Sequence, residues 1–179
     1  MKALTILQPW ADCICYFGKR VENRTWAPYP AVVGTRIAIH AGKAFDDRGH
    51  TATMKNRDIV GPVGVVSHLH WILLASPKRP RGAVVATAIV HGITRSGDSP
   101  WFCGPFGWIL RDVVVLKDPI PCRGAQLLWG LPADVEKALD AAEVVNGGAG
   151  ELHRAFLDRM AAIDAKAPAL PGCAPEVRP

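Results

Sequence analysis

The 179-residue sequence lacks the features that define several large protein classes. It has no stretch of about 18 apolar residues, the length that a helix needs to cross a bilayer. The first six residues are followed by Gln8-Pro9 and Asp12 instead of the apolar core and cleavage site of a secretion signal. We therefore expect a cytoplasmic protein that is not associated with a membrane.

Signatures of metal, redox and nucleotide chemistry are also missing. The five cysteines include no CxxC pair, and an odd number of them is typical of reduced thiols in a cytosolic protein. Neither a Gly-rich phosphate loop nor the Gly-x-Ser-x-Gly of α/β-hydrolases is present. His68 and His70 are two residues apart, but no third ligand is placed nearby. The sequence thus predicts no metal and no cofactor.

What the sequence does contain is a modest excess of positive charge. The formal net charge is +5, with charged residues making up 21% of the chain. Such a balance fits a partner that carries phosphates. It is equally common in soluble proteins that bind no polyanion, so charge alone leaves both possibilities open.

Short apolar runs separated by turn signals predict a mainly β fold of the α+β class. A helix over residues 9–18 is expected between the first two strands, because Pro is favoured in the first turn of a helix and Gly at its end. Pro119 and Pro121 are expected to end the last strand. Several short strands with few helices indicate a barrel or a sandwich. The predicted strands cover residues 3–7, 36–41, 82–90 and 107–116, and residues 59–66 are ambiguous.

The composition changes near residue 132. Residues 133–144 and 151–166 have helical spacing of apolar side chains and are separated by a Gly-rich break. We therefore predict a globular domain at 1–132, a helical C-terminal extension at 133–166 and a flexible Pro-rich tail at 167–179.

The segment of residues 18–26 carries the most concentrated charge. Lys19, Arg20, Glu22 and Arg24 lie within six residues, next to Gly18. If this segment is extended, Glu22, Arg24 and Trp26 face the same side. The cations and the carboxylate can hold a phosphate or a base edge, or they can form a mutual salt bridge and nothing more.

Two further groups are candidates for ligand contacts. His40 and Lys43 end a predicted strand at Gly42, where a ligand can approach the backbone closely. Four aromatic residues lie within residues 101–108, and a base can stack on aromatic side chains in a loop. Trp101 and Trp26 are the candidates for stacking, although packing in the core is the alternative for both the loop aromatics and His40.

Taken together, these motifs resemble the ASCH family (activating signal cointegrator homology) in the PUA-like group. The family signature is similar to Gly-x-Lys-x-x-Glu-x-Arg. Lys19, Glu22 and Arg24 match its Lys-x-x-Glu-x-Arg part, whereas the Gly is displaced by one residue, to Gly18. The resemblance extends over residues 1–132. It is also carried by residues 3–11, 39–43, 104–110, 121–124 and 128–132.

The resemblance implies a PUA-like β-barrel with a few peripheral helices, and a cleft whose floor carries the signature. It also implies RNA or a modified nucleoside as the ligand, bound by Lys19, Arg20, Glu22, Arg24, Trp26, His40, Lys43 and Trp101. One branch of the family hydrolyses 4-acetylcytidine with a Thr nucleophile. Because this chain has Glu22 at that position, a nucleic-acid-binding module is the leading hypothesis.

Two alternatives remain. A nucleoside amidohydrolase or a ribonuclease would use Lys19 and Glu22 as the catalytic acid/base pair, with Lys19 stabilising an oxyanion. A protein-interaction module would use the C-terminal helices to bind an unknown protein partner.

Overall fold

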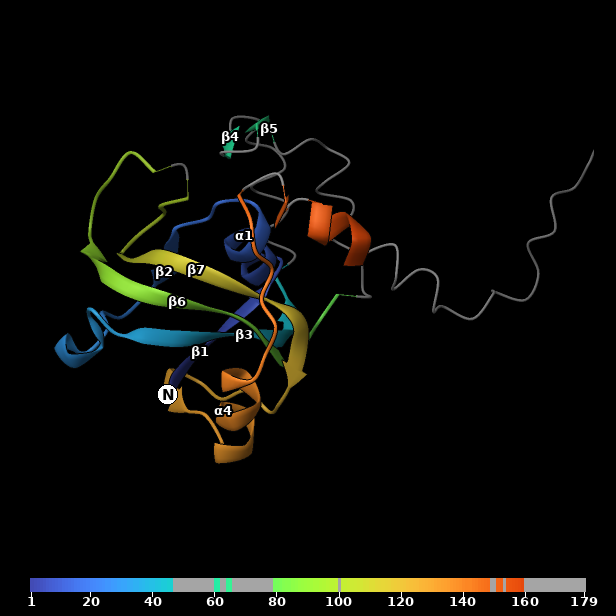
Figure 1. Cartoon of the computed structure of the whole chain (residues 1–179). Helices are drawn as coiled ribbons and strands as arrows, with labels where there is room; N and C mark the ends of the chain where they lie inside the picture. Colours follow the sequence, from blue (N-terminus) through green and yellow to red (C-terminus); the bar gives the residue numbers. More distant parts are fainter. Residues whose placement is uncertain are drawn as a thin grey trace, which may run out of the picture.

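The computed structural model describes residues 1–46, 60–61, 64–65, 79–99, 101–148, 151–152 and 154–159 (Figure 1). Its helices are α1 (Trp10–Tyr16), the 3-10 helix η1 (Pro30–Val32) and α4 (Ala133–Asp140). Residues 151–152 and 154–159 are also helical. Its strands are β1 (Lys2–Gln8), β2 (Val21–Arg24), β3 (Arg36–Phe45), β4 (Val60–Gly61), β5 (Gly64–Val65), β6 (Ala83–Thr94), β7 (Phe106–Pro121) and β8 (Leu128–Gly130).

Several expectations fall outside the described residues. They concern His68 and His70, the end of the second C-terminal helix at 160–166, and the tail at 167–179. None of the helices in the described part of the chain is long and apolar enough to cross a membrane.

Six strands form one mixed sheet in the order β2-β7-β6-β3-β1-β8, and β4 pairs with β5 in a separate hairpin. β1 runs parallel to β3, whereas the other pairs of the large sheet are antiparallel. The predicted mainly β, α+β class is confirmed. The predicted barrel is corrected to an open sheet, because β2 and β8, at the two ends of the strand order, are not paired to each other.

The strand β7 is longer than predicted: it continues through Pro119 and ends at Pro121, so the expected end at Pro119 was wrong. β7 pairs with β2 over Phe106–Ile109 and is bridged at Leu116 by Val144, but around Pro119 and Pro121 it pairs with β6 alone among the described residues. A proline lacks the N–H that a second neighbour would need, and it is therefore tolerated along such an edge. Asp112, with φ of 47°, marks an irregularity within the strand where the register with β6 shifts.

The two faces of the sheet bury different partners. Leu4 and Ile6 of β1 belong to the larger core, which includes the buried face of α1, whereas the adjacent Ala3 belongs to a smaller core with α4. This alternation follows from the opposite orientation of successive side chains in a strand. Val135 and Leu139 of α4 complete the smaller core. The sheet is therefore covered by α1 on one face and by α4 on the other (Figure 1).

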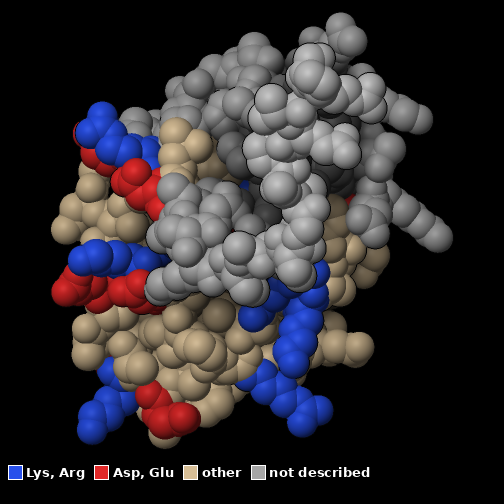
Figure 2. All heavy atoms as spheres, turned by 90° about the vertical axis from the view of Figure 1, so that its right-hand side faces the viewer, with Lys and Arg blue, Asp and Glu red and all other residues tan. Residues whose placement is uncertain are grey.

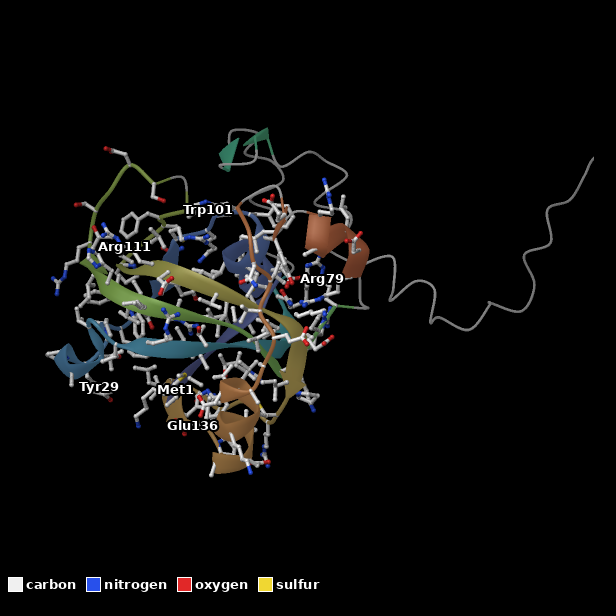
Figure 3. All side chains as sticks on the ribbon, viewed as in Figure 1. Met1, Tyr29, Arg79, Trp101, Arg111 and Glu136 are labelled. Atoms are coloured by element: carbon white, nitrogen blue, oxygen red, sulfur yellow. The ribbon has the colours of Figure 1, made fainter. Side chains whose placement is uncertain are left out.

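The first C-terminal helix is shorter than predicted, and both C-terminal helical segments pack against the rest of the chain. α4 ends at Asp140 instead of near 144, because Val144 forms a β-bridge with Leu116 of β7. Phe156 is 2% exposed and lies against Phe17, with 5.1 Å between the ring centroids. The guanidinium of Arg79, labelled in Figure 3, lies 5.0 Å from the centroid of the Phe156 ring. α4 therefore packs against the sheet, whereas the helical segment that carries Phe156 packs against the end of α1.

Candidate functional site

The end of α1 positions Lys19. Gly18 has a φ of +70°, a left-handed conformation that glycine adopts without a steric penalty. The amide of Lys19 donates to the carbonyl of Cys13 at 3.0 Å, and the same carbonyl accepts from the amide of Phe17 at 3.1 Å, so the chain folds back onto the last turn of the helix. The glycine that is displaced from the family signature thus ends the helix and turns Lys19 into the protein.

Glu22 binds two cations at once. Its Oε2 accepts from Lys19 Nζ at 2.6 Å, and its Oε1 lies 3.1 Å from the Nη2 of Arg24. Lys19 Nζ also donates to the carbonyl of Val21 at 2.6 Å. The alternation of β2 explains the contact, since residues 22 and 24 face the same side of a strand. The mutual salt bridge that the sequence left open is therefore present.

Most of this charged network is buried. The side chains of Lys19 and Glu22 are 3% and 7% exposed, and that of Arg24 is 20% exposed. Two cations and one carboxylate leave one uncompensated positive charge among these three groups. The thiol of Cys13 lies in the same environment, where burial raises its pKa to about 12 even though Lys19 lowers it. Cys13 is thus a neutral, unreactive neighbour of the network.

Arg24 is the member of the network that reaches the surface. Its Nη2 donates to the carbonyl of Thr5 at 2.7 Å, so the side chain links β2 to β1 although these strands are not paired. Its Nε is buried and has no hydrogen-bond partner among the described residues. Buried donors are bonded in nine of ten or more cases, so this N–H marks a position where an acceptor would be favourable.

Arg20 lies outside this network. Its Nη1 donates to the carbonyl of Ile14 at 2.7 Å and to that of Lys19 at 3.2 Å. A cation at these carbonyls stabilises the C-terminal end of α1. Burial lowers the pKa of Arg20. The contacts of Arg20 are thus those of a helix cap.

The aromatic candidates differ in exposure. Trp101 is 8% exposed and packs in the larger core. Trp26 is half-buried, and its ring meets that of Trp108 edge to face at 4.8 Å between centroids. Trp108 is fully buried and pairs with Glu22 in the register of β2 and β7, so Trp26 lies beside the charged network. Of the two predicted stacking residues, Trp26 is the one with a partly accessible ring.

His40 is buried at the centre of a second polar cluster, which also includes Thr5 and the backbone of Cys122 and Gly124. Its Nε2 lies 3.2 Å from the carbonyl of Cys122, whereas its Nδ1 has no hydrogen-bond partner. Burial lowers the pKa of His40, and the hydrogen bond to Cys122 opposes this only in part. Gly124 covers the ring so closely that a Cβ there would lie 2.3 Å from Cε1 and 2.6 Å from Nδ1.

Thr5 joins the two clusters, and sequence reasoning did not identify it. Its carbonyl accepts from Arg24, and its hydroxyl donates to the carbonyl of Ala125 at 2.8 Å. Thr5 is also paired with His40 in the register of β1 and β3. The one signal in the sequence is that Thr5 is polar, whereas its neighbours in the predicted strand 3–7 are apolar. That signal does not indicate which distant residues Thr5 contacts.

Asn23 is a second residue that the sequence did not single out. Its side chain donates to the carbonyl of Trp101 at 2.8 Å and accepts from the amide of Cys103 at 3.0 Å. Asn23 therefore fixes the aromatic loop against β2, on the strand that carries Glu22 and Arg24.

Lys43 lies away from the network, beyond the last residue pair of β3 and β6, and its side chain is exposed. The structure therefore brings Lys19, Glu22, Arg24 and Trp26 together, and it connects them to His40 through Thr5. Within the described ranges, no group of three His, Cys, Asp or Glu side chains is arranged to hold a metal ion.

Comparison with known proteins gives matches among solved structures alone. No protein-family model and no curated protein matches the chain. The crystal structure of ASCH from Zymomonas mobilis is similar at 16% identity and a TM-score of 0.47, over 79% of this chain and 95% of that one. A mutant of the same Zymomonas mobilis protein is similar at 16% identity and a TM-score of 0.46, over 79% of this chain and 96% of that one. These structural neighbours are ASCH structures, and ASCH is the family that the sequence motifs resemble.

Proposed function

We propose that this chain is a binding module for single-stranded or modified RNA, in which Arg24 meets an acceptor on a base or a phosphate. The observation that carries the proposal is the unpaired, buried Nε of Arg24 in a network with one excess positive charge. A guanidinium offers its N–H groups as a planar fork, which suits the paired acceptors of a base edge or a phosphate.

The surroundings of Arg24 support a nucleobase as the ligand. Glu22, which is itself bound by Lys19, holds the guanidinium of Arg24. The orientation of the guanidinium is therefore set before a ligand arrives. Trp26, half-buried beside the network, offers an aromatic ring on which an unpaired base can stack. In this proposal Lys19 and Glu22 position Arg24 and do not contact the ligand.

Binding of short RNAs, with and without modified bases, tests this proposal. We expect binding at low salt that weakens as salt rises, because phosphate contacts release counterions. Arg24→Gln should weaken it about tenfold or more, since a charged hydrogen bond is worth about 1.5–3 kcal/mol. Arg111→Gln is the matched control, because Arg111 is exposed. Absence of binding by the wild type, or equal affinity of the Arg24 variant, would refute the proposal.

The hydrolase alternative makes a different prediction. It requires Lys19 and Glu22 to meet the substrate, and both are nearly inaccessible and bound to each other. Product formation from 4-acetylcytidine and from RNA is the discriminating assay. Turnover that disappears in both Lys19→Met and Glu22→Gln, with the fold intact, would replace the binding module by an enzyme.

The protein-interaction alternative relies on the C-terminal helices. The apolar side chains Val135, Leu139 and Phe156 of these helices are buried against the rest of the chain. They are therefore unavailable to a partner in this arrangement. A variant that ends at residue 132 and retains its RNA affinity would limit these helices to a structural role.

A further inference from the structure

Three cations lie at the ends of three neighbouring strands. Lys43 is two residues beyond Ala41 of β3, and Arg81 is two residues before Ala83 of β6, with which Ala41 is paired. Arg123 follows β7 by two residues, and the last residue of β7, Pro121, is also paired with Ala83. The pairing thus places residues 43, 81 and 123 next to one another in a row at one end of the sheet, beyond the paired residues of β3, β6 and β7.

Contacts around Gly82 show that the row is compact. Arg81 Nη1 donates to the carbonyl of Lys43 at 3.2 Å, and the amide of Cys122 donates to the carbonyl of Gly82 at 3.0 Å. A Cβ at Gly82 would lie 3.3 Å from Cε of Lys43 and 3.9 Å from the carbonyl oxygen of Cys122. The three strand ends are thus in direct contact.

None of the three cations of this row forms an ion pair with another described residue. Arg36 pairs with Asp112, Arg79 with Asp12 and Lys117 with Glu143, whereas no ion pair is formed there by Lys43, Arg81 or Arg123. Like charges on adjacent strands destabilise a sheet. In Figure 2, Lys and Arg side chains stand at the lower right without Asp or Glu beside them, whereas on the left the two signs lie together. Binding of an anion to this row would relieve the repulsion between its like charges.

Arg81 is oriented before any ligand binds. Its guanidinium lies 5.7 Å from the centroid of the Phe45 ring, and its Nη1 is held by the carbonyl of Lys43. Its Nε is buried, and no described residue accepts a hydrogen bond from it. A fixed guanidinium loses little side-chain entropy when an anion binds, which favours phosphate binding.

The row is connected to the proposed RNA site. Thr5 accepts from Arg24 and is paired with His40, and His40 contacts the carbonyl of Cys122, the residue before Arg123. We infer that Lys43, Arg81 and Arg123 form a phosphate track for the backbone of a single-stranded RNA. This inference rests on the proposed function. It adds the path that the RNA backbone takes beyond the base bound at Arg24.

The salt dependence of RNA binding by the full chain tests the track. For a single strand, each phosphate contact contributes about 0.7 to the slope of log K against log salt. The triple variant Lys43→Gln/Arg81→Gln/Arg123→Gln should therefore lower the slope by about 2 and weaken oligonucleotide binding at low salt. Binding of the corresponding nucleoside, which has no phosphate, should not change.

A second triple variant controls for net charge. Lys2→Gln/Arg111→Gln/Lys137→Gln removes the same charge from exposed positions in β1, β7 and α4. Arg111 lies at the opposite end of the sheet from the row (Figure 3). If both triple variants lower the slope equally, the salt dependence reflects the net charge of the protein, and the inferred phosphate track is wrong. The double variant Lys43→Gln/Arg123→Gln, at exposed positions, should lower the slope by about 1.4 even if Arg81→Gln affects folding.

The outcomes separate this inference from the proposed function. RNA binding that depends on Arg24 but has an unchanged slope in the triple and double variants would overturn the track and leave the proposed function intact. Absence of any RNA binding by the wild type would overturn both. Competition by poly-aspartate as effective as competition by RNA would overturn the assignment to a nucleic acid.

Discussion

Replacing Glu22 by Gln should destabilise the protein strongly. This substitution preserves the shape of the side chain but leaves Lys19 and Arg24 without a counter-charge. At 2.6 Å and an effective dielectric constant of about 20, the Lys19–Glu22 attraction alone is about 6 kcal/mol. Most of it offsets the desolvation of the two groups, and removal of one partner of a buried pair typically costs about 3–5 kcal/mol. We expect a loss of that size, a large part of the stability of a typical domain.

Urea unfolding of the wild type, Glu22→Gln, Lys19→Met and the double variant measures this effect. The double variant should lose less than the two single variants together, because the second substitution removes the charge that the first left unpaired. The Glu22 effect should persist at high salt, since a buried pair is screened weakly.

Glu143→Gln is the matched control, because Glu143 forms an exposed pair with Lys117. It should cause no resolvable change in unfolding. A loss below about 1 kcal/mol for Glu22→Gln would refute the reasoning that the network is desolvated.

Three further predictions concern the surroundings of the network. Gly124→Ala should lower the melting temperature, because its Cβ would overlap the buried His40 ring, whereas Gly130→Ala, with no atom within 4 Å of the added Cβ, should not. Phe156→Ala should cost about 3–5 kcal/mol in urea unfolding by leaving a cavity against α1, and little loss would show that the C-terminal helix does not stabilise the domain. Because burial lowers the pKa of His40, the unfolded state binds the proton more readily, and stability should be complete above the unfolded pKa of about 6.5 and fall below it. Melting curves of wild type and His40→Gln across this pH range check it, and equal acid sensitivity of the two would contradict the assignment.

Local patterns determined much of the secondary structure. Pro9 and Gly18 delimit α1, and the apolar run near residues 82–90 forms the centre of β6, because these signals act through backbone conformation and side-chain burial over a few residues. The error at Pro119 arose because a proline interrupts a strand only where a neighbouring strand needs its N–H. Whether β7 has a second neighbour there depends on the rest of the sheet.

For the charged segment of residues 18–26, too, the sequence determined one part of the arrangement and the tertiary structure determined the rest. Residue spacing alone placed Glu22 and Arg24 on one side of a strand and brought Lys19 into the same group. The sequence could not decide between a ligand contact and a mutual salt bridge, since both use the same residues. The tertiary structure placed Lys19 and Glu22 in the interior and left Arg24 at the surface with its Nε unpaired. Likewise, only the pairing of β3, β6 and β7 brings Lys43, Arg81 and Arg123 into one row, because burial and contacts between distant residues depend on how the strands assemble.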